Sequence, residues 1–176
     1  KNEKPDYLAK AFESLLKQTV TAKELVLVKD GYIPDELNEV IDEYQKSLNI
    51  KIIALDKNLG LGKALAIGLD HCNNELIARM DTDDICHPDR FEKQLELLRN
   101  KPEIDIVGSW ITEFENNQCE VYAKRELPIT SLELSNFSRK RNPLNHMTVM
   151  FKKSSVMAVG GYGSYRFAQD YHLWSK

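Results

Sequence analysis

The feature that most constrains the fold of this chain is the regular alternation of helical and strand-like segments along its first hundred residues. Apolar residues recur three or four positions apart in the helical segments, and short β-prone apolar runs lie between them. The predicted order is a helix at 5–18, a strand at 24–28, a helix at 34–47, a strand at 50–55, a turn and helix at 58–71, a strand at 76–80 and a helix at 88–100. Such alternation is typical of βαβ units, which build parallel sheets with right-handed crossovers. We therefore predict the α/β class.

In the second half of the chain, helical and strand-like segments no longer alternate regularly. Two strand-like runs, at 104–111 and 119–123, flank a polar turn at 115–118, which favours a small antiparallel element. The remaining predicted segments are a helix or loop at 131–141, a strand at 145–151, a short helix at 154–159 and a helix that starts near 167. With 176 residues, no internal repeat and no low-complexity stretch, residues 1–176 are predicted to form one domain.

The composition excludes some classes of protein. The net charge of -3 gives no electrostatic basis for nucleic acid binding, and no apolar run reaches the length of a membrane span. The odd number of cysteines, three, predicts a reducing compartment with free thiols. The basic cluster at 139–141 is best interpreted as a solvated face, and the alternative is contact with an anionic acceptor or a membrane surface. Because the first residue is Lys, we expect a longer parent protein, trimmed at the front and at the back.

Three aspartates, Asp81, Asp83 and Asp84, follow an apolar run at 76–78 that leads into Met80, with Thr82 among them. Like charges this close repel, and partly buried carboxylates must bind protons or meet a cation. A hard divalent cation, Mg²⁺ or Mn²⁺, suits such a cluster, with a phosphate completing its coordination shell. The alternative is a helix start at which aspartates cap backbone N–H groups, a role that suits Asp84. Capping does not require an acid directly at the end of an apolar strand, so we favour the metal site.

Polar residues also follow the two preceding strands. Asp30 comes after the first, and the segment Asn-Leu-Gly-Leu-Gly-Lys at 58–63 comes after the second. Ligands bind where the carboxyl ends of parallel strands meet, so these residues are predicted to converge with the aspartates. Asp30 is either an ordinary turn residue or an acceptor for a base or ribose. The 58–63 segment matches neither the dinucleotide fingerprint nor the P-loop, so a plain turn is an equal alternative. Lys63, in the first helical turn, is placed to reach a diphosphate.

The second half contributes two further candidates. His146 begins an apolar strand, where a lone histidine is more often structural than catalytic. Asp170 lies at a helix start between Gln169 and Tyr171, where it is either an N-cap or a general base that takes a proton from an attacking hydroxyl.

Taken together, the order and spacing of these motifs resemble family 2 inverting glycosyltransferases with the GT-A fold. The closest likeness is to the bacterial enzymes that build lipopolysaccharide, capsule or exopolysaccharide. The resemblance covers nearly the whole chain and rests on the segments 15–19, 26–31, 58–65, 78–84, 88–91, 145–151 and 169–174.

The resemblance implies a Rossmann-like, mostly parallel twisted sheet flanked by helices, with a nucleotide-binding half at 1–100 and an acceptor-side half at 101–176. It implies a cytoplasmic enzyme, peripheral at the inner face of the cytoplasmic membrane, with a UDP-sugar donor and a glycan or lipid-linked acceptor. The implied contacts to the nucleotide sugar are Asp30 to the base, Asp81 to the ribose or metal, and also Asn58, Lys63 and Thr82. Asp83, with Asp81, would hold Mg²⁺ or Mn²⁺, and Asp170 would be the catalytic base. The residues implied to make further contacts with the sugar donor or the acceptor are Asp84, His146 and Gln169.

The chemistry agrees with this resemblance. A metal offsets the charge that develops on a diphosphate leaving group, and one carboxylate suffices to deprotonate the acceptor for direct displacement with inversion. Three departures from the family pattern stand out. The chain begins after the usual first strand, Lys29 stands where an acid is common, and Gln169 stands where a Glu is common.

Alternative functions remain at this stage. A sugar-phosphate nucleotidylyltransferase shares the fold neighbourhood and usually has a glycine-rich, basic loop after its first strand, but the surroundings of Asp170 fit a sugar transferase better. A non-catalytic sugar-nucleotide-binding or scaffold domain predicts that Asp170→Asn leaves function intact. An unrelated Rossmann-like binder is disfavoured because no dinucleotide fingerprint is present.

Overall fold

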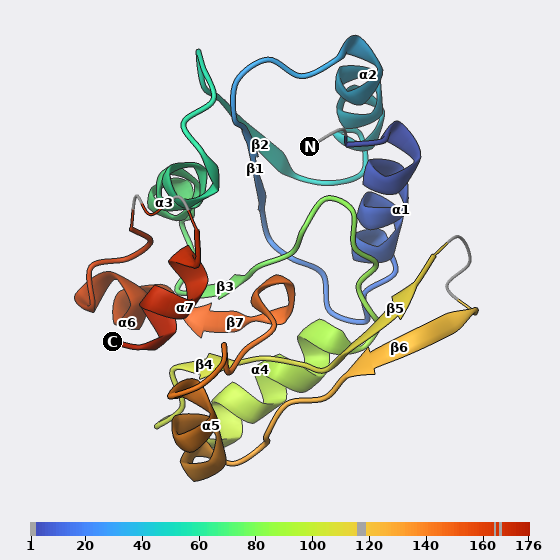
Figure 1. The fold of residues 1–176 in the computed structure, drawn as a ribbon. Coiled ribbons are helices and arrows are strands. Elements are labelled where there is room, and N and C mark those ends of the chain that lie inside the picture. Colours follow the sequence, from blue (N-terminus) through green and yellow to red (C-terminus); the bar gives the residue numbers. More distant parts are fainter. Residues whose placement is uncertain (1–2, 116–118, 164, 166) are drawn as a thin grey trace.

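The computed structural model describes residues 3–115, 119–163, 165 and 167–176 (Figure 1). Its helices are α1 (Pro5–Leu16), α2 (Asp35–Tyr44), α3 (Leu61–His71), α4 (Arg90–Asn100), α5 (Ser131–Ser138), α6 (Lys153–Ala158) and α7 (Gln169–Trp174), with a 3₁₀ turn η1 (His146–Thr148). Its strands are β1 (Leu25–Lys29), β2 (Ile50–Ala54), β3 (Leu76–Ala78), β4 (Ile106–Val107), β5 (Ile111–Phe114), β6 (Val121–Arg125) and β7 (Met150–Lys152). The predicted α/β class is confirmed, and every helix and strand expected in the first hundred residues is present.

The strands form three short sheets in the described part of the chain, where the resemblance implied one mostly parallel sheet. β1 and β2 pair in parallel, with Leu25 opposite Ile50. β7 lies between β3 and β4 and is antiparallel to both, so β3 and β4 run in the same direction and each pairs with β7. β5 and β6 form the antiparallel element that the second half predicted. The expected parallel pairing is therefore found for β1 and β2, whereas β3 and β4 are joined by the antiparallel strand β7.

Two predicted strands of the second half are shorter than expected. The run at 104–111 divides into β4 and β5, and the run at 145–151 begins as the turn η1 before β7. Thr148 explains both changes, because its hydroxyl donates to the carbonyl of Asn145 at 2.8 Å and accepts from the amide of Ser109 at 2.8 Å. Side-chain bonds of this kind compete with strand pairing. Of the predicted turn at 115–118, residues 116–118 lie outside the described residues.

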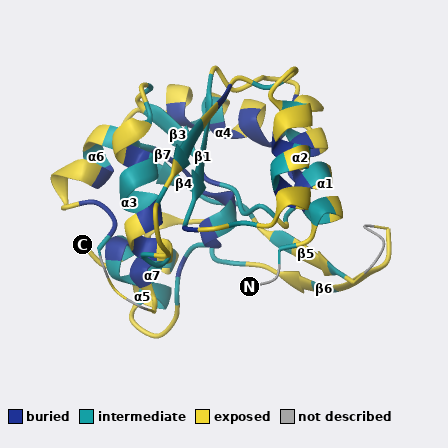
Figure 2. Cartoon of the chain, turned by 90° about the horizontal axis from the view of Figure 1, so that it is seen from above, coloured by how far each residue is buried: buried dark blue, intermediate teal, exposed yellow. Residues whose placement is uncertain are grey.

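Three apolar clusters hold the elements together. One packs α1 and α2 on β1 and β2, a second packs α3, α6 and α7 on β7, and a third packs α4 on β3 and β7. Their most buried members include Ile41, Val149 and Phe151. Figure 2 shows this burial, with the dark blue faces of the helices turned toward the strands. The helices thus fix the ends of the strands, where the polar motifs emerge.

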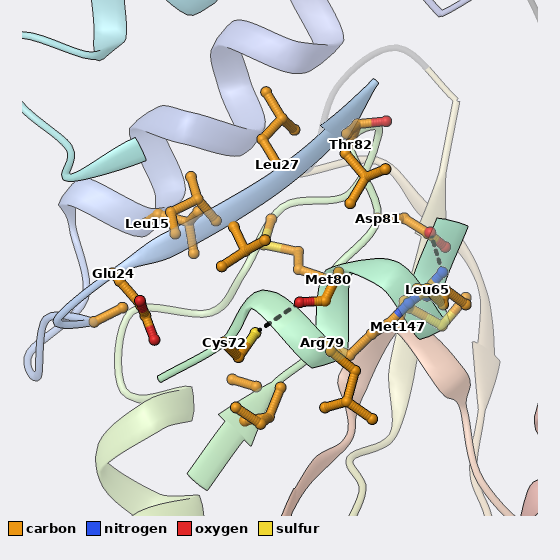
Figure 3. Close-up of a pocket in the computed structure, with 18 of the residues that line it drawn as sticks. Leu15, Glu24, Leu27, Leu65, Cys72, Arg79, Met80, Asp81, Thr82 and Met147 are labelled. Carbon is orange, nitrogen blue, oxygen red and sulfur yellow. Dashed lines mark hydrogen bonds and ion pairs between the residues drawn. The ribbon is translucent and has the colours of Figure 1, made fainter. Parts of the chain in front are cut away.

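A cavity of about 1450 Å³ separates β1 from β3, and every residue of both strands lines it. Its walls are largely apolar near Leu15, Leu27 and Leu65, as Figure 3 shows. β1 pairs with β2 and β3 pairs with β7, and within the described ranges no strand pairs with the second edge of either. The backbone groups of these two edges are therefore available to a further extended segment.

Candidate active site

The acidic cluster forms a tight loop directly after β3. The amide of Asp84 approaches the carbonyl of Asp81 at 3.4 Å, and one carboxylate oxygen from each of Asp81, Asp83 and Asp84 lies within 4.8 Å of the others. Asp83 is exposed, whereas its two neighbours are half-buried. α4 begins only at Arg90 with Asp89 as its N-cap residue, so the alternative of Asp84 as the cap of that helix is wrong. Three carboxylates at this spacing are a donor set that fits Mg²⁺ or Mn²⁺.

Arg79 is the cationic partner that these aspartates require, and sequence reasoning missed it. Its side chain is only 7% exposed and forms an ion pair with Asp81, drawn as a dashed line in Figure 3. A signal was present in the sequence, because Arg79 is a charged residue within the predicted strand at 76–80 and lies two positions before Asp81. In the structure β3 ends at Ala78, so the two side chains meet just after the strand. Asp83 is the most exposed of the three acids, so its carboxylate is the most accessible to a cation from solvent.

A second buried arginine, Arg90, stabilises the backbone from which this loop emerges. The Nη2 of Arg90 donates to the carbonyl of Arg79 at 2.7 Å and to the carbonyl of Val149 at 3.3 Å. The amide of Arg79 in turn donates to Val149 at 2.8 Å, which extends the β3–β7 pairing by one residue. Arg90 therefore fixes the backbone at the point where the chain leaves the sheet and turns into the acidic loop.

Asp30 holds the loop that precedes α3. Its carboxylate accepts from the amide of Leu59 at 2.6 Å and from the amide of Gly60 at 3.0 Å, and its carbonyl accepts from the Asn58 side chain at 3.2 Å. Gly31 allows this approach, since its φ is +90° and a Cβ there would lie 2.7 Å from the amide nitrogen of Asn58. Asp30 therefore lies next to the 58–63 segment, as predicted. The hydrogen bonds that it makes there stabilise the loop before α3.

The second glycine of the 58–63 segment has a packing role. A Cβ on Gly62 would lie 2.4 Å from the carbonyl oxygen of Gly163 and 3.6 Å from the Cβ of Gln169. The first turn of α3 thus packs directly on the start of α7. This contact brings the first-half motif that ends at the exposed Lys63 next to the motif that contains Asp170.

Asp170 lies in the first turn of α7, which follows the left-handed residue Ala168 at φ 53°. The N-cap position belongs to Ala168, so the alternative of Asp170 as the N-cap is wrong. One carboxylate oxygen of Asp170, Oδ2, accepts from the side-chain amide of Asn142 at 2.6 Å. Gln169, beside it, is buried.

His146 is a buried neutral residue at the centre of the site. Its Nε2 lies 3.0 Å from the Tyr162 hydroxyl, and its ring meets that of Trp174 edge-on. Burial and the nearby Arg79 cation lower the pKa of His146 to about 4, while Asp170 acts in the opposite direction. Burial also raises the pKa of Tyr162. Since Arg79 and Asp170 both act on this pair, the acidic loop of the first half and the carboxylate of the second half belong to one electrostatic cluster.

The cavity collects six of the predicted site residues: Asp30, Asn58, Asp81, Thr82, Asp83 and His146. The other four, Lys63, Asp84, Gln169 and Asp170, are described but do not line it. Tyr162 and Arg79, which sequence reasoning did not select, do line it. Residues from each of the first-half motifs therefore share one cavity, and His146 and Tyr162, which also line it, lie near enough to Asp170 for its charge to act on them.

This architecture is that of solved glycosyltransferases. The mannosyltransferase PcManGT from Pyrobaculum calidifontis, solved in complex with GDP-Man and Mn²⁺, superposes with a TM-score of 0.71 at 14% identity, over 98% of this chain and 48% of that one. S. aureus TarS 1–349 in complex with UDP gives 0.71 at 18% identity, over 96% and 50%. At such identities the likeness establishes the GT-A fold alone.

Sequence comparison establishes the family. The model of glycosyl transferase family 2 matches residues 1–166, and the chain belongs to that family. It is 42% identical to the amylovoran biosynthesis glycosyltransferase AmsE of Erwinia amylovora, over 98% of this chain and 64% of that protein. It is 40% identical to the UDP-Gal:alpha-D-GlcNAc-diphosphoundecaprenol beta-1,3-galactosyltransferase of Escherichia coli, over 99% and 63%. The chain thus spans less than two thirds of the length of these relatives.

Proposed function

We propose that this chain is the catalytic part of an inverting glycosyltransferase of cell-surface polysaccharide biosynthesis. It transfers a sugar from a nucleoside-diphosphate sugar to a glycan or lipid-linked acceptor. The observation that carries the proposal is the carboxylate cluster at the end of β3, which shares a cavity with Asp30 and Asn58. Relatives named for amylovoran, O-antigen and diphosphoundecaprenol-linked sugar biosynthesis support the same class of reaction.

In this proposal Asp83 and Asp81 hold Mg²⁺ or Mn²⁺. Asp83 supplies an exposed carboxylate, and Arg79 fixes the orientation of Asp81. The bound ion would act as a Lewis acid toward the diphosphate of the donor. Mn²⁺ in the PcManGT complex supports the choice of metal.

The proposed donor is a UDP-sugar, because the relative named for UDP-Gal is 40% identical, whereas the GDP-Man complex is only 14% identical. Asp30 and Asn58 form the cavity wall that would face the base. An ionised carboxylate has about four acceptor sites, so Asp30 can accept a further hydrogen bond while it holds Leu59 and Gly60. Thr82 would contact the donor near the acidic loop, and Lys63 would reach the diphosphate from α3.

Asp170 is the proposed general base, which takes the proton of the acceptor hydroxyl as that oxygen attacks the anomeric carbon. A single carboxylate suffices because direct displacement inverts the centre without a covalent intermediate. We assign His146 a neighbouring role, because burial lowers its pKa to about 4, which makes the imidazole a weak base, and its Nε2 already faces the Tyr162 hydroxyl at 3.0 Å. We propose that His146, Gln169 and Asp84 shape the pocket around donor and acceptor.

The proposed acceptor side is the second half of the chain, and a lipid-linked acceptor would bring the enzyme to the inner face of the cytoplasmic membrane. Exposed apolar side chains there, Tyr122, Ile129 and Leu132, support contact with such an acceptor. In the described ranges, no helix has the length and apolar character needed to cross a bilayer.

We also propose that a further strand of the full-length protein fills the cavity between β1 and β3 and completes a single domain. The two open strand edges and the apolar walls support this placement. Hydrogen exchange tests it, because the amides of β1 should exchange more slowly in the longer protein than in residues 1–176.

The function itself is tested by calorimetry with UDP in the presence and absence of Mn²⁺, followed by a screen of UDP-sugars for slow hydrolysis. We expect UDP to bind only with the metal, and Asp83→Ala to abolish that dependence. Equal UDP affinity with and without Mn²⁺ would contradict the metal assignment. A nucleotidylyltransferase would instead release pyrophosphate from UTP and a sugar 1-phosphate, and a binding module would hydrolyse no sugar nucleotide.

A further inference from the structure

The carboxylate of Asp170 is held by a residue that lies 28 positions away in sequence and in no recognised motif. The Nδ2 of Asn142 donates to Oδ2 of Asp170 at 2.6 Å. We propose that Asn142 is a positioning residue for the general base, an inference that rests on the proposed function. It fixes the carboxylate so that the second oxygen, Oδ1, is presented to the acceptor hydroxyl. The described residues give Oδ1 no hydrogen-bond donor of its own.

The orientation of the Asn142 amide is itself determined by its surroundings. Its Oδ1 accepts from the amide of Leu144 at 3.2 Å, across the buried Pro143. An amide carbonyl can accept this bond but an NH₂ group cannot. The NH₂ group must therefore be the end that faces Asp170.

A second bond ties the same two segments together. The hydroxyl of Tyr171 donates to the carbonyl of Ser138 at the end of α5. α7 is only six residues long and starts from a left-handed residue, so its first turn has little intrinsic stability. The bonds from Asn142 and Tyr171 thus supply the rigidity that the helix lacks at the position of the base.

The chemical nature of the hydrogen-bond donor to Asp170 is as important as its position. A neutral amide orients a carboxylate without forming an ion pair, whereas a lysine or arginine here would favour the ionised form strongly and weaken the base. General bases also lose efficiency when misplaced, because a displacement of about 1 Å costs on the order of a hundredfold in rate. An asparagine at this position meets both requirements.

The test is a double-mutant cycle with Asn142→Ala and Asp170→Asn, with UDP-galactose as donor, water as acceptor and Mn²⁺ present. We expect Asn142→Ala to lower kcat by about tenfold or more while the KM for UDP-galactose and the Kd for UDP change less than about twofold. On the Asp170→Asn background the same change should have no further effect. Asn136→Ala, at an exposed position of α5, is the matched control and should behave as the unchanged protein.

Asn142→Asp is the second variant if the alanine variant folds poorly. It keeps the volume and the acceptor for Leu144 but lacks the donor, so kcat should fall at least as far. Unchanged kcat in either variant, or an equal loss on both backgrounds, would overturn the positioning role. Absence of Mn²⁺-dependent UDP binding in the unchanged protein would instead contradict the proposed function, and this inference with it.

Discussion

Asp81→Asn and Asp83→Asn each remove one carboxylate from the same loop, yet we expect them to affect stability very differently. Asp81 pairs with Arg79, whose side chain is 7% exposed, so its loss leaves a buried cation without its partner. Breaking a fully buried pair costs about 3–5 kcal/mol, and the 35% exposure of Asp81 reduces the expected cost here to about 1.5–3 kcal/mol. Asp83 is exposed to solvent, so its removal should change stability by no more than about 0.5 kcal/mol.

Thermal denaturation in EDTA measures this difference. For a chain of this size, about 2–4 °C in Tm corresponds to 1 kcal/mol, so Asp81→Asn should unfold roughly 2–14 °C below Asp83→Asn. Adding Mn²⁺ and UDP should then raise the Tm of the unchanged protein but not that of Asp83→Asn. A cycle with Arg79→Gln isolates the pair, since Asp81→Asn should cost much less once the cation is gone. Equal Tm values for the two asparagine variants in EDTA would refute the reasoning.

Three further predictions follow from the site. Gly62→Ala should destabilise the protein by about 1–3 kcal/mol in urea denaturation, because its Cβ would meet the carbonyl of Gly163; a neutral outcome would contradict the close packing of α3 on α7. The pKa of His146 falls from 6.5 to about 4 on folding, so the unfolded chain binds the extra proton between these values. Stability should therefore drop as the pH falls from 6.5 toward 4, and His146→Gln should flatten that part of the profile of urea midpoints. Lys63→Ala, an exposed change, should leave Tm unchanged but weaken the binding of UDP relative to uridine, and equal weakening of both would argue against a diphosphate contact.

The features that sequence could predict are those encoded by local pattern. The alternation of helices and strands in the first hundred residues follows from periodicity within single segments, and the convergence of Asp30 with 58–63 follows from the geometry of neighbouring parallel strands. The acidic cluster was evident because its three members lie within four residues.

The features that sequence could not predict depend on pairings between distant segments. β7 lies more than 70 residues after β3 in the chain, and its reversed insertion between β3 and β4 leaves no local signature. The bond from Asn142 to Asp170 is of the same kind. The pair of Arg79 with Asp81 differs from these, because it is local: a charged residue directly after an apolar strand and two positions before an aspartate already indicated an ion pair.

The cavity between β1 and β3 has a mechanical consequence. A cavity of about 1450 Å³ lies between these two strands, and among the described residues no backbone pairing crosses it. Asp30 stands at the end of β1 and Asp81 just beyond β3, so the width of this gap sets the separation between them. A strand that filled this gap would act as a rigid spacer and would keep Asp30 and Asp81 at a constant distance from each other.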